Sequence, residues 1–153
     1  MIVHAGLVAK KFSGQWRGVL IEGPSESGKS DLALRVLNLG FRIVADDRVA
    51  LFVAKGRLFG RAPAPLTGLL EVRGLGITWF DPVPFADVSL VVSCIKSGDA
   101  ERLPRKKRSI LIAGVRIPLA EIPALEASAP AKLCRAFEVL GSAAQQDYDA
   151  AFA

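Results

Sequence analysis

Histidine and cysteine are scarce in this sequence. The chain of 153 residues contains one histidine, His4, and two cysteines, Cys94 and Cys134. A single histidine excludes His-rich zinc sites, and the two cysteines lie in apolar stretches without CxxC spacing. We therefore expect both cysteines to be buried, reduced thiols rather than metal ligands.

Long apolar runs are also missing. No segment is long enough to span a bilayer, and the first residues lack the basic-then-apolar pattern of a secretory signal. These absences predict a cytoplasmic protein without a membrane partner. Hydrophobic residues make up 51% of the chain, which is enough for a core, and the length fits one domain. We expect a single domain over residues 1–153, with an Ala- and Gln-rich tail that frays from about residue 142.

Acidic residues are outnumbered by basic ones. The formal net charge is +5 and the pI is near 9.6, which suits a phosphate-bearing ligand, an acidic partner or nucleic acid. The densest basic run, residues 102–108, is equally consistent with a solvated loop and with a binding role. Aromatic residues do not interleave with the basic ones, so we predict no nucleic-acid partner.

Apolar periodicity alternates between strand and helix patterns. It predicts strands over residues 3–11, 17–22, 41–45, 49–53, 57–59, 87–95, 109–113 and 115–117. Two helices are expected, one that begins at Lys29 and ends at Gly40, and one opened by Pro130. Segment 69–77 is too glycine-rich to predict a strand. The order strand, loop, helix, strand favours an α/β fold.

The loop between the second strand and the first helix carries the strongest motif. It matches the phosphate-binding pattern G-x-x-x-x-G-K-[S/T], in which backbone N–H groups and a helix N-terminus bind phosphate oxygens. The predicted nucleotide-binding residues are Gly23, Pro24, Ser25, Glu26, Ser27, Gly28, Lys29 and Ser30. Lys29 would reach the outer phosphates and Ser30 would join a magnesium shell. The Glu26 carboxylate would face phosphate charge unless it turns outward.

Two carboxylates follow the next strand. Asp46 and Asp47 lie where a carboxylate pair could hold magnesium and accept a proton from an attacking hydroxyl. Asp-Asp is also common in ordinary turns. Its position at the end of a strand in the phosphate-loop unit favours the functional interpretation.

Together these segments resemble the catalytic domain of HPr kinase/phosphorylase. The resemblance rests on Gly23–Ser30, on Gly40–Asp47 and on Gly68–Ile77, which is similar to the family's signature segment. It extends from about His4 to about Ile122. It implies a P-loop domain of the phosphoenolpyruvate carboxykinase-like kinase fold, with a mixed sheet and flanking helices.

The resemblance also implies an activity. Family members use ATP and Mg²⁺ to phosphorylate a serine of HPr, a phosphocarrier of the sugar phosphotransferase system, and tend to form homo-oligomers. A nitrogen-type phosphocarrier is a related candidate partner. Carried over by position, the resemblance implies that Asp47 accepts the proton of the serine hydroxyl and that His4 and Asp46 support it. Lys29 and Arg102 would stabilise the charge of the phosphoryl group. Ser30 and Glu71 would bind magnesium.

The sequence departs from the family pattern in three ways. His4 lies almost at the first residue, which resembles the short alphaproteobacterial form without the N-terminal domain. Glu26 replaces a loop glycine, and the late Pro-x-x-Gly-Arg-Asn segment has no match near residues 125–130, which leaves phosphorolysis open. Two alternatives to a protein kinase remain open, a non-catalytic nucleotide sensor and a small-molecule kinase.

Overall fold

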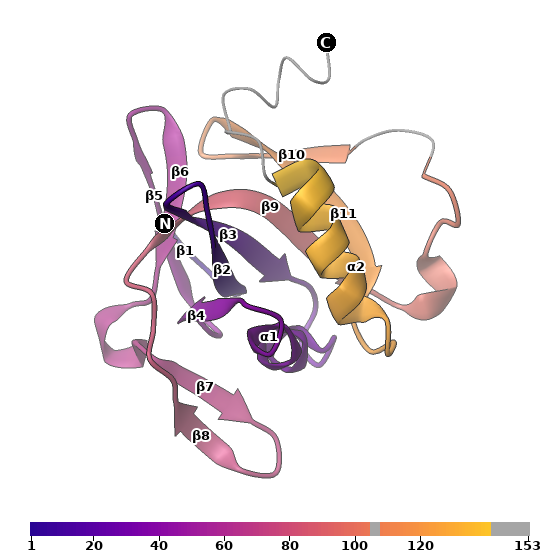
Figure 1. The fold of residues 1–153 in the computed structure, drawn as a ribbon, viewed down its shortest axis with the longest axis horizontal. Helices are drawn as coiled ribbons and strands as arrows, with labels where there is room; N and C mark the ends of the chain where they lie inside the picture. The colour runs from indigo at the N-terminus through magenta and orange to yellow at the C-terminus, as the bar shows by residue number, and fades with distance from the viewer. Residues whose placement is uncertain (105–107, 142–153) are drawn as a thin grey trace.

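Strands dominate the regular structure of the chain (Figure 1). The computed structural model describes residues 1–104 and 108–141. The strands are β1 Ile2–Val3, β2 Gly6–Phe12, β3 Gln15–Glu22, β4 Arg42–Ala45, β5 Val49–Ala54, β6 Arg57–Arg61, β7 Leu69–Val72, β8 Gly76–Trp79, β9 Ala86–Ile95, β10 Arg108–Ile112 and β11 Val115–Pro123. The helices are α1 Lys29–Leu37 and α2 Ala129–Ala136, with short turns η1 Ala64–Leu66, η2 Ser97–Asp99 and η3 Phe137–Gly141.

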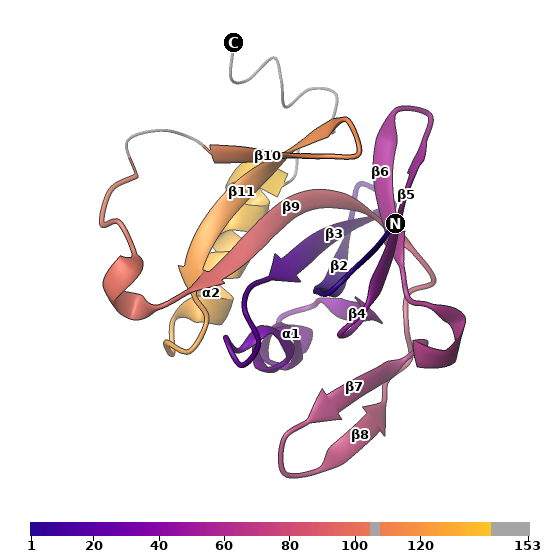
Figure 2. The same cartoon turned by 180° about the vertical axis from the view of Figure 1, so that it is seen from behind.

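Nine of the described strands form one mixed, curled sheet (Figure 2). Its order is β1-β5-β6-β9-β3-β2-β4, and β11 adds to β9 and in turn pairs with β10. The pairs β3–β9 and β9–β11 are parallel, while β2 is antiparallel to both β3 and β4. Strands β4, β3, β9 and β11 therefore run in one direction. Their carboxyl ends meet at one edge of the sheet, where ligands of α/β sheets commonly bind.

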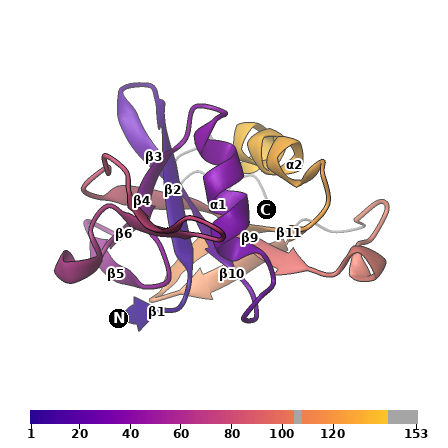
Figure 3. The ribbon, with the colours of Figure 1, turned by 90° about the horizontal axis from the view of Figure 1, so that it is seen from below.

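Apolar side chains on both faces of the central strands form two clusters. On one face, Leu90 and Val92 of β9 pack with Leu32 of α1 and Leu133 of α2. Figure 3 shows both helices on this face, side by side. On the other face, Val91 belongs to a second cluster with residues of β5, β6 and β11, which the curl of the sheet brings together. Burial on both faces explains why β3 and β9 are nearly continuous apolar runs.

Helix α1 follows directly from the phosphate-loop motif. Its buried face consists of Leu32, Ala33 and Val36, which is the predicted spacing. The helix ends at Leu37, and a further turn reaches Gly40, whose φ of +92° lets the chain reverse into β4. The strand, loop, helix and strand predicted from the sequence are therefore confirmed.

The segment after residue 68 differs from the prediction. Strands β7 and β8 form a separate hairpin that projects from the main sheet beside α1 (Figures 1 and 2). Gly74 and Gly76, with φ of +91° and +92°, lie at the hairpin turn, where positive φ is needed. Leu70 and Val72 are buried on the inner face. The glycines therefore permit the turn that joins the two strands.

Other expectations need smaller corrections. Segment 3–11 contains two strands, β1 and β2, and β11 extends to Pro123 because it pairs in parallel with β9. Cys94 is buried, whereas Cys134 is only partly buried, and both are free thiols. The fraying predicted for the tail from residue 142 lies outside the described residues. Within residues 1–104 and 108–141, no helix is long and apolar enough to cross a bilayer.

Candidate active site

A cleft of about 570 Å³ opens at the edge where the parallel strands end. It brings together the phosphate loop, the start of α1, the residues that precede β2, the end of β4 and the turn end of the β7–β8 hairpin. The predicted site residues that line it are His4, Ser25, Glu26, Gly28, Lys29, Ser30, Asp46, Asp47 and Glu71. Segments that are far apart in the sequence thus meet in one site.

The phosphate loop holds its own lysine. The Lys29 ammonium donates hydrogen bonds of 2.8 Å to the carbonyl oxygens of Gly23 and of Pro24. Gly28 precedes the helix with a φ of +96°, a left-handed conformation that favours glycine. Glu26 is exposed and also left-handed, with a φ of +63°. The loop therefore keeps a cation at the start of α1, next to the free N–H groups of its first turn.

Cys94 of β9 packs against the backbone of this loop. A Cβ on Gly23 would lie 3.0 Å from the Cys94 Cβ, so the loop backbone rests closely on β9. Burial raises the pKa of the Cys94 thiol to about 11, which keeps the thiol protonated at neutral pH. This residue therefore supports the loop as a small, neutral side chain.

Asp46 is a buried carboxylate at the end of β4. Its Oδ1 accepts a 2.8 Å hydrogen bond from the Ser30 hydroxyl, and its Oδ2 accepts one of 3.5 Å from the backbone N–H of Glu71. Desolvation by burial raises the pKa of Asp46, although both hydrogen bonds oppose that shift. A cation beside this carboxylate would favour its charged form.

Asp47 points to a different partner. Its Oδ1 lies 2.7 Å from His4 Nε2, and both side chains are about half exposed. Arg48 Nε is 4.0 Å from the second carboxylate oxygen. Asp47 has a φ of +67°, which aspartate tolerates better than most residues. The adjacent aspartates thus differ, because Asp46 is buried against Ser30 whereas Asp47 faces the open cleft.

Among the described residues, the arginine that lines the cleft is Arg73, from the turn of the β7–β8 hairpin. The predicted Arg102 lies exposed in the loop after η2 and does not line the cleft. Sequence reasoning did not select Arg73, although it lies within the glycine-rich segment 68–77. It also missed Leu125, an apolar residue that lines the same cleft. Only the projection of the hairpin toward α1 identifies Arg73 as a cleft residue.

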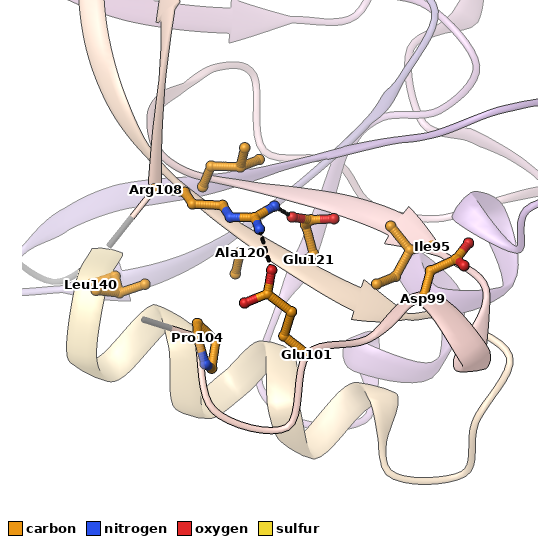
Figure 4. Close-up of a pocket in the computed structure, with 9 residues that line it drawn as sticks. Ile95, Asp99, Glu101, Pro104, Arg108, Ala120, Glu121 and Leu140 are labelled. Atoms are coloured by element: carbon orange, nitrogen blue, oxygen red, sulfur yellow. Dashed lines mark hydrogen bonds and ion pairs between the residues drawn. The ribbon is translucent and has the colours of Figure 1, made fainter. Parts of the chain in front are cut away.

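A second cavity, of about 320 Å³, lies next to the loop that carries Arg102 (Figure 4). Arg108 extends into it and forms ion pairs with Glu101, at 2.7 Å, and with Glu121. These two carboxylates offset the charge of Arg108. Arg108 therefore takes part in a partly exposed ion-pair network, and none of the predicted site residues lines the cavity.

Comparisons with known proteins agree on one family. The family model described as the HPr serine kinase C-terminal domain matches residues 13–152, a range that begins after His4. HPr kinase/phosphorylase of Streptococcus thermophilus is 35% identical over 144 residues, which cover 87% of this chain and 47% of the relative. The enzyme of the same name from Cupriavidus necator is 38% identical over 117 residues, which cover 69% of this chain and 36% of the relative. The chain thus spans about half the length, or less, of these curated relatives.

A solved structure extends the comparison to the fold. The Hpr(Ser) kinase/phosphatase from Coxiella burnetii superposes with a TM-score of 0.74 at 25% identity. The match covers 91% of this chain and 97% of that one. The mixed α/β architecture predicted from the sequence is therefore confirmed.

Proposed function

We infer a kinase function for this chain, which belongs to the HPr serine kinase C-terminal domain family. We propose that it uses ATP and Mg²⁺ to phosphorylate a serine of HPr or of a related phosphocarrier, the nitrogen type included. One observation carries the proposal. A single cleft contains a phosphate loop and, apart from it, an exposed carboxylate hydrogen-bonded to a histidine. Phosphoryl transfer to a hydroxyl requires this combination of phosphate site and proton acceptor.

The phosphate loop would bind the nucleotide. Residues 23–30 present backbone N–H groups and the N-terminus of α1 to phosphate oxygens. Lys29 would exchange its two carbonyl partners for phosphate oxygens, which accept stronger, charge-assisted hydrogen bonds. Arg73, which also lines the cleft, would add positive charge near the transferred group. Arg102 could contribute only if its loop moves toward the cleft.

Three oxygen-bearing side chains suit a magnesium ion. Ser30 and Asp46 are already in contact, and Glu71 lies beside them through its backbone N–H. Hydroxyl and carboxylate oxygens are the ligands that Mg²⁺ prefers, and the buried Asp46 would gain from a nearby cation. The Ser30 and Asp46 oxygens therefore fit the ion, and Glu71 lines the same cleft. When bound, Mg²⁺ would neutralise charge on the transferred phosphoryl group.

Asp47 would act as the proton acceptor. It is exposed to the cleft, so a serine hydroxyl could approach its carboxylate, and His4 fixes its orientation at 2.7 Å. Asp46 already accepts a hydrogen bond from Ser30, so the two aspartates would have different roles. Asp46 would take part in binding the metal, and Asp47 would accept the proton.

A phosphotransfer assay tests the proposal. The purified chain would be incubated with ATP, Mg²⁺ and either HPr or a nitrogen-type phosphocarrier, with and without inorganic phosphate. Mass spectrometry should detect a new phosphoserine on one of the carriers. Absence of phosphoserine on both carriers, with ATP binding intact, would refute the kinase proposal and support a nucleotide sensor. Loss of the phosphoserine on addition of phosphate would indicate phosphorolysis.

A further inference from the structure

One apolar side chain at the cleft has no part in the chemistry proposed above. Leu125 lies in the turn between β11 and α2, and it is 74% exposed. A Cβ on Gly28 would come within 2.8 Å of Leu125 Cδ2, so the leucine stands directly beside the phosphate loop. Exposed leucine next to a phosphate site offers contact area to an apolar part of the ligand.

The turn that carries Leu125 is held in place by a residue of α1. The Arg35 guanidinium donates one hydrogen bond to the carbonyl oxygen of Ala124 and another, of 3.1 Å, to that of Glu126. These carbonyls flank Leu125 on both sides. The same guanidinium lies 2.9 Å from the Asp31 carboxylate. The backbone around Leu125 is therefore fixed before any ligand binds, which lowers the entropic cost of a contact there.

The order of the strands places Leu125 opposite the proton acceptor. Asp47 follows β4 at one end of the strand row, Leu125 follows β11 at the other, and the phosphate loop after β3 lies between them. Figures 1 and 2 show this arrangement, with β4 and β11 on opposite sides of β3. In phosphoryl transfer the attacking and leaving oxygens lie roughly in line. The leaving diphosphate would therefore point away from Asp47 and across the loop, and the nucleoside attached to it would continue toward Leu125.

We propose that Leu125 is the apolar platform for the purine base of the bound nucleotide, and that Arg35 positions it. The inference rests on the proposed function, because it takes ATP as the ligand of the phosphate loop. It assigns the two ends of the cleft to different parts of the reaction. The β4 end receives the acceptor serine, and the β11 end receives the nucleoside.

Isothermal titration of the whole chain with two ligands tests this assignment. ATP has a base, whereas inorganic tripolyphosphate has only the phosphates, and both are titrated in the presence of Mg²⁺. In Leu125→Ala we expect about five- to tenfold weaker ATP binding, as for the loss of part of a leucine contact, and unchanged tripolyphosphate binding. Leu125→Met should retain most of the ATP affinity. Leu111→Ala, at a 60% exposed leucine of β10, is the matched control and should bind both ligands normally.

The outcomes separate this inference from the proposed function. Equal weakening of ATP and tripolyphosphate in Leu125→Ala would show that Leu125 supports the loop, and would overturn the assignment of a base platform. Unchanged binding of both ligands would overturn it as well. If neither ligand binds the parent chain, the proposed nucleotide site fails, and the inference fails with it.

Discussion

Replacing Asp47 with asparagine tests whether its side chain acts in catalysis or only stabilises the fold. The backbone of Asp47 is left-handed, with a φ of +67°. Asparagine adopts this region about as readily as aspartate, whereas alanine would add roughly 1–2 kcal/mol of strain. Asp47→Asn therefore removes the charge and basicity of the side chain without disturbing the backbone.

Stability and activity should respond very differently to this change. The side chains of His4 and Asp47 are 45% and 59% exposed, and an exposed side-chain contact of this kind contributes roughly 0–1 kcal/mol. The midpoint of urea unfolding should therefore hardly move. A general base accelerates proton transfer by about 10²–10⁴-fold, equivalent to roughly 3–5 kcal/mol of the barrier. We expect the phosphotransfer rate to fall by that factor.

The assay compares initial rates of phosphoserine formation at saturating ATP, with ATP affinity measured separately by titration. Asp81→Asn is the matched control, because Asp81 is a 78% exposed carboxylate paired with Arg42 at 2.9 Å and does not line the cleft. Its rate should equal that of the parent. A rate for Asp47→Asn within about tenfold of the parent, at unchanged ATP affinity, would refute the role of Asp47 as the base.

Three further changes probe the cleft and the sheet beneath it. Burial raises the pKa of Asp46, so the folded chain binds this proton more tightly than the unfolded chain and loses stability as the pH rises through that pKa. In calorimetry without divalent cations, the melting temperature of Asp46→Asn should therefore rise relative to that of the parent as the pH increases from about 4, and a difference that does not change with pH would contradict the assignment. A Cβ on Gly18 would lie 2.6 Å from the Asp87 carbonyl oxygen, so Gly18→Ala should cost about 1–3 kcal/mol in urea unfolding, while Gly98→Ala, with nothing within 4 Å, should be neutral. Glu26→Gly should bind ATP more tightly and fold at least as well, because glycine adopts the left-handed backbone without strain, and weaker binding would argue against a repulsive carboxylate.

Local signals explain which parts of the fold could be predicted. The unit from β3 to β4 is encoded within one stretch, by an apolar run, the glycine-lysine loop, the spacing of Leu32 and Val36, and Gly40. The β7–β8 hairpin was not predicted from the sequence. Glycine weakens a strand but permits a tight turn, and the glycine content of a segment does not show which of these effects applies. The length of β11 was also missed, since its second half is set by parallel pairing with β9.

The residues of the candidate site could likewise be predicted only where a local sequence pattern marks them. The phosphate motif and the Asp46–Asp47 pair are visible in the sequence, but their different environments are not. Adjacent residues at a strand end point in different directions, and only the packed neighbours decide that one meets Ser30 and the other meets His4. Leu125 could not have been selected from the sequence. Its exposure beside Gly28 depends on the hydrogen bonds of Arg35, a residue ninety positions earlier in the chain.

The short strand β1 has a practical consequence for the design of these experiments. Its two residues pair with β5 through Ile2↔Ala50 and Val3↔Val49, and Leu51 N–H donates to the Met1 carbonyl oxygen at 2.7 Å. His4 follows immediately. A peptide joined ahead of Met1, such as a purification tag, would therefore be attached only three residues before His4, which lines the cleft. Kinetic measurements on tagged protein should be repeated after the tag has been removed.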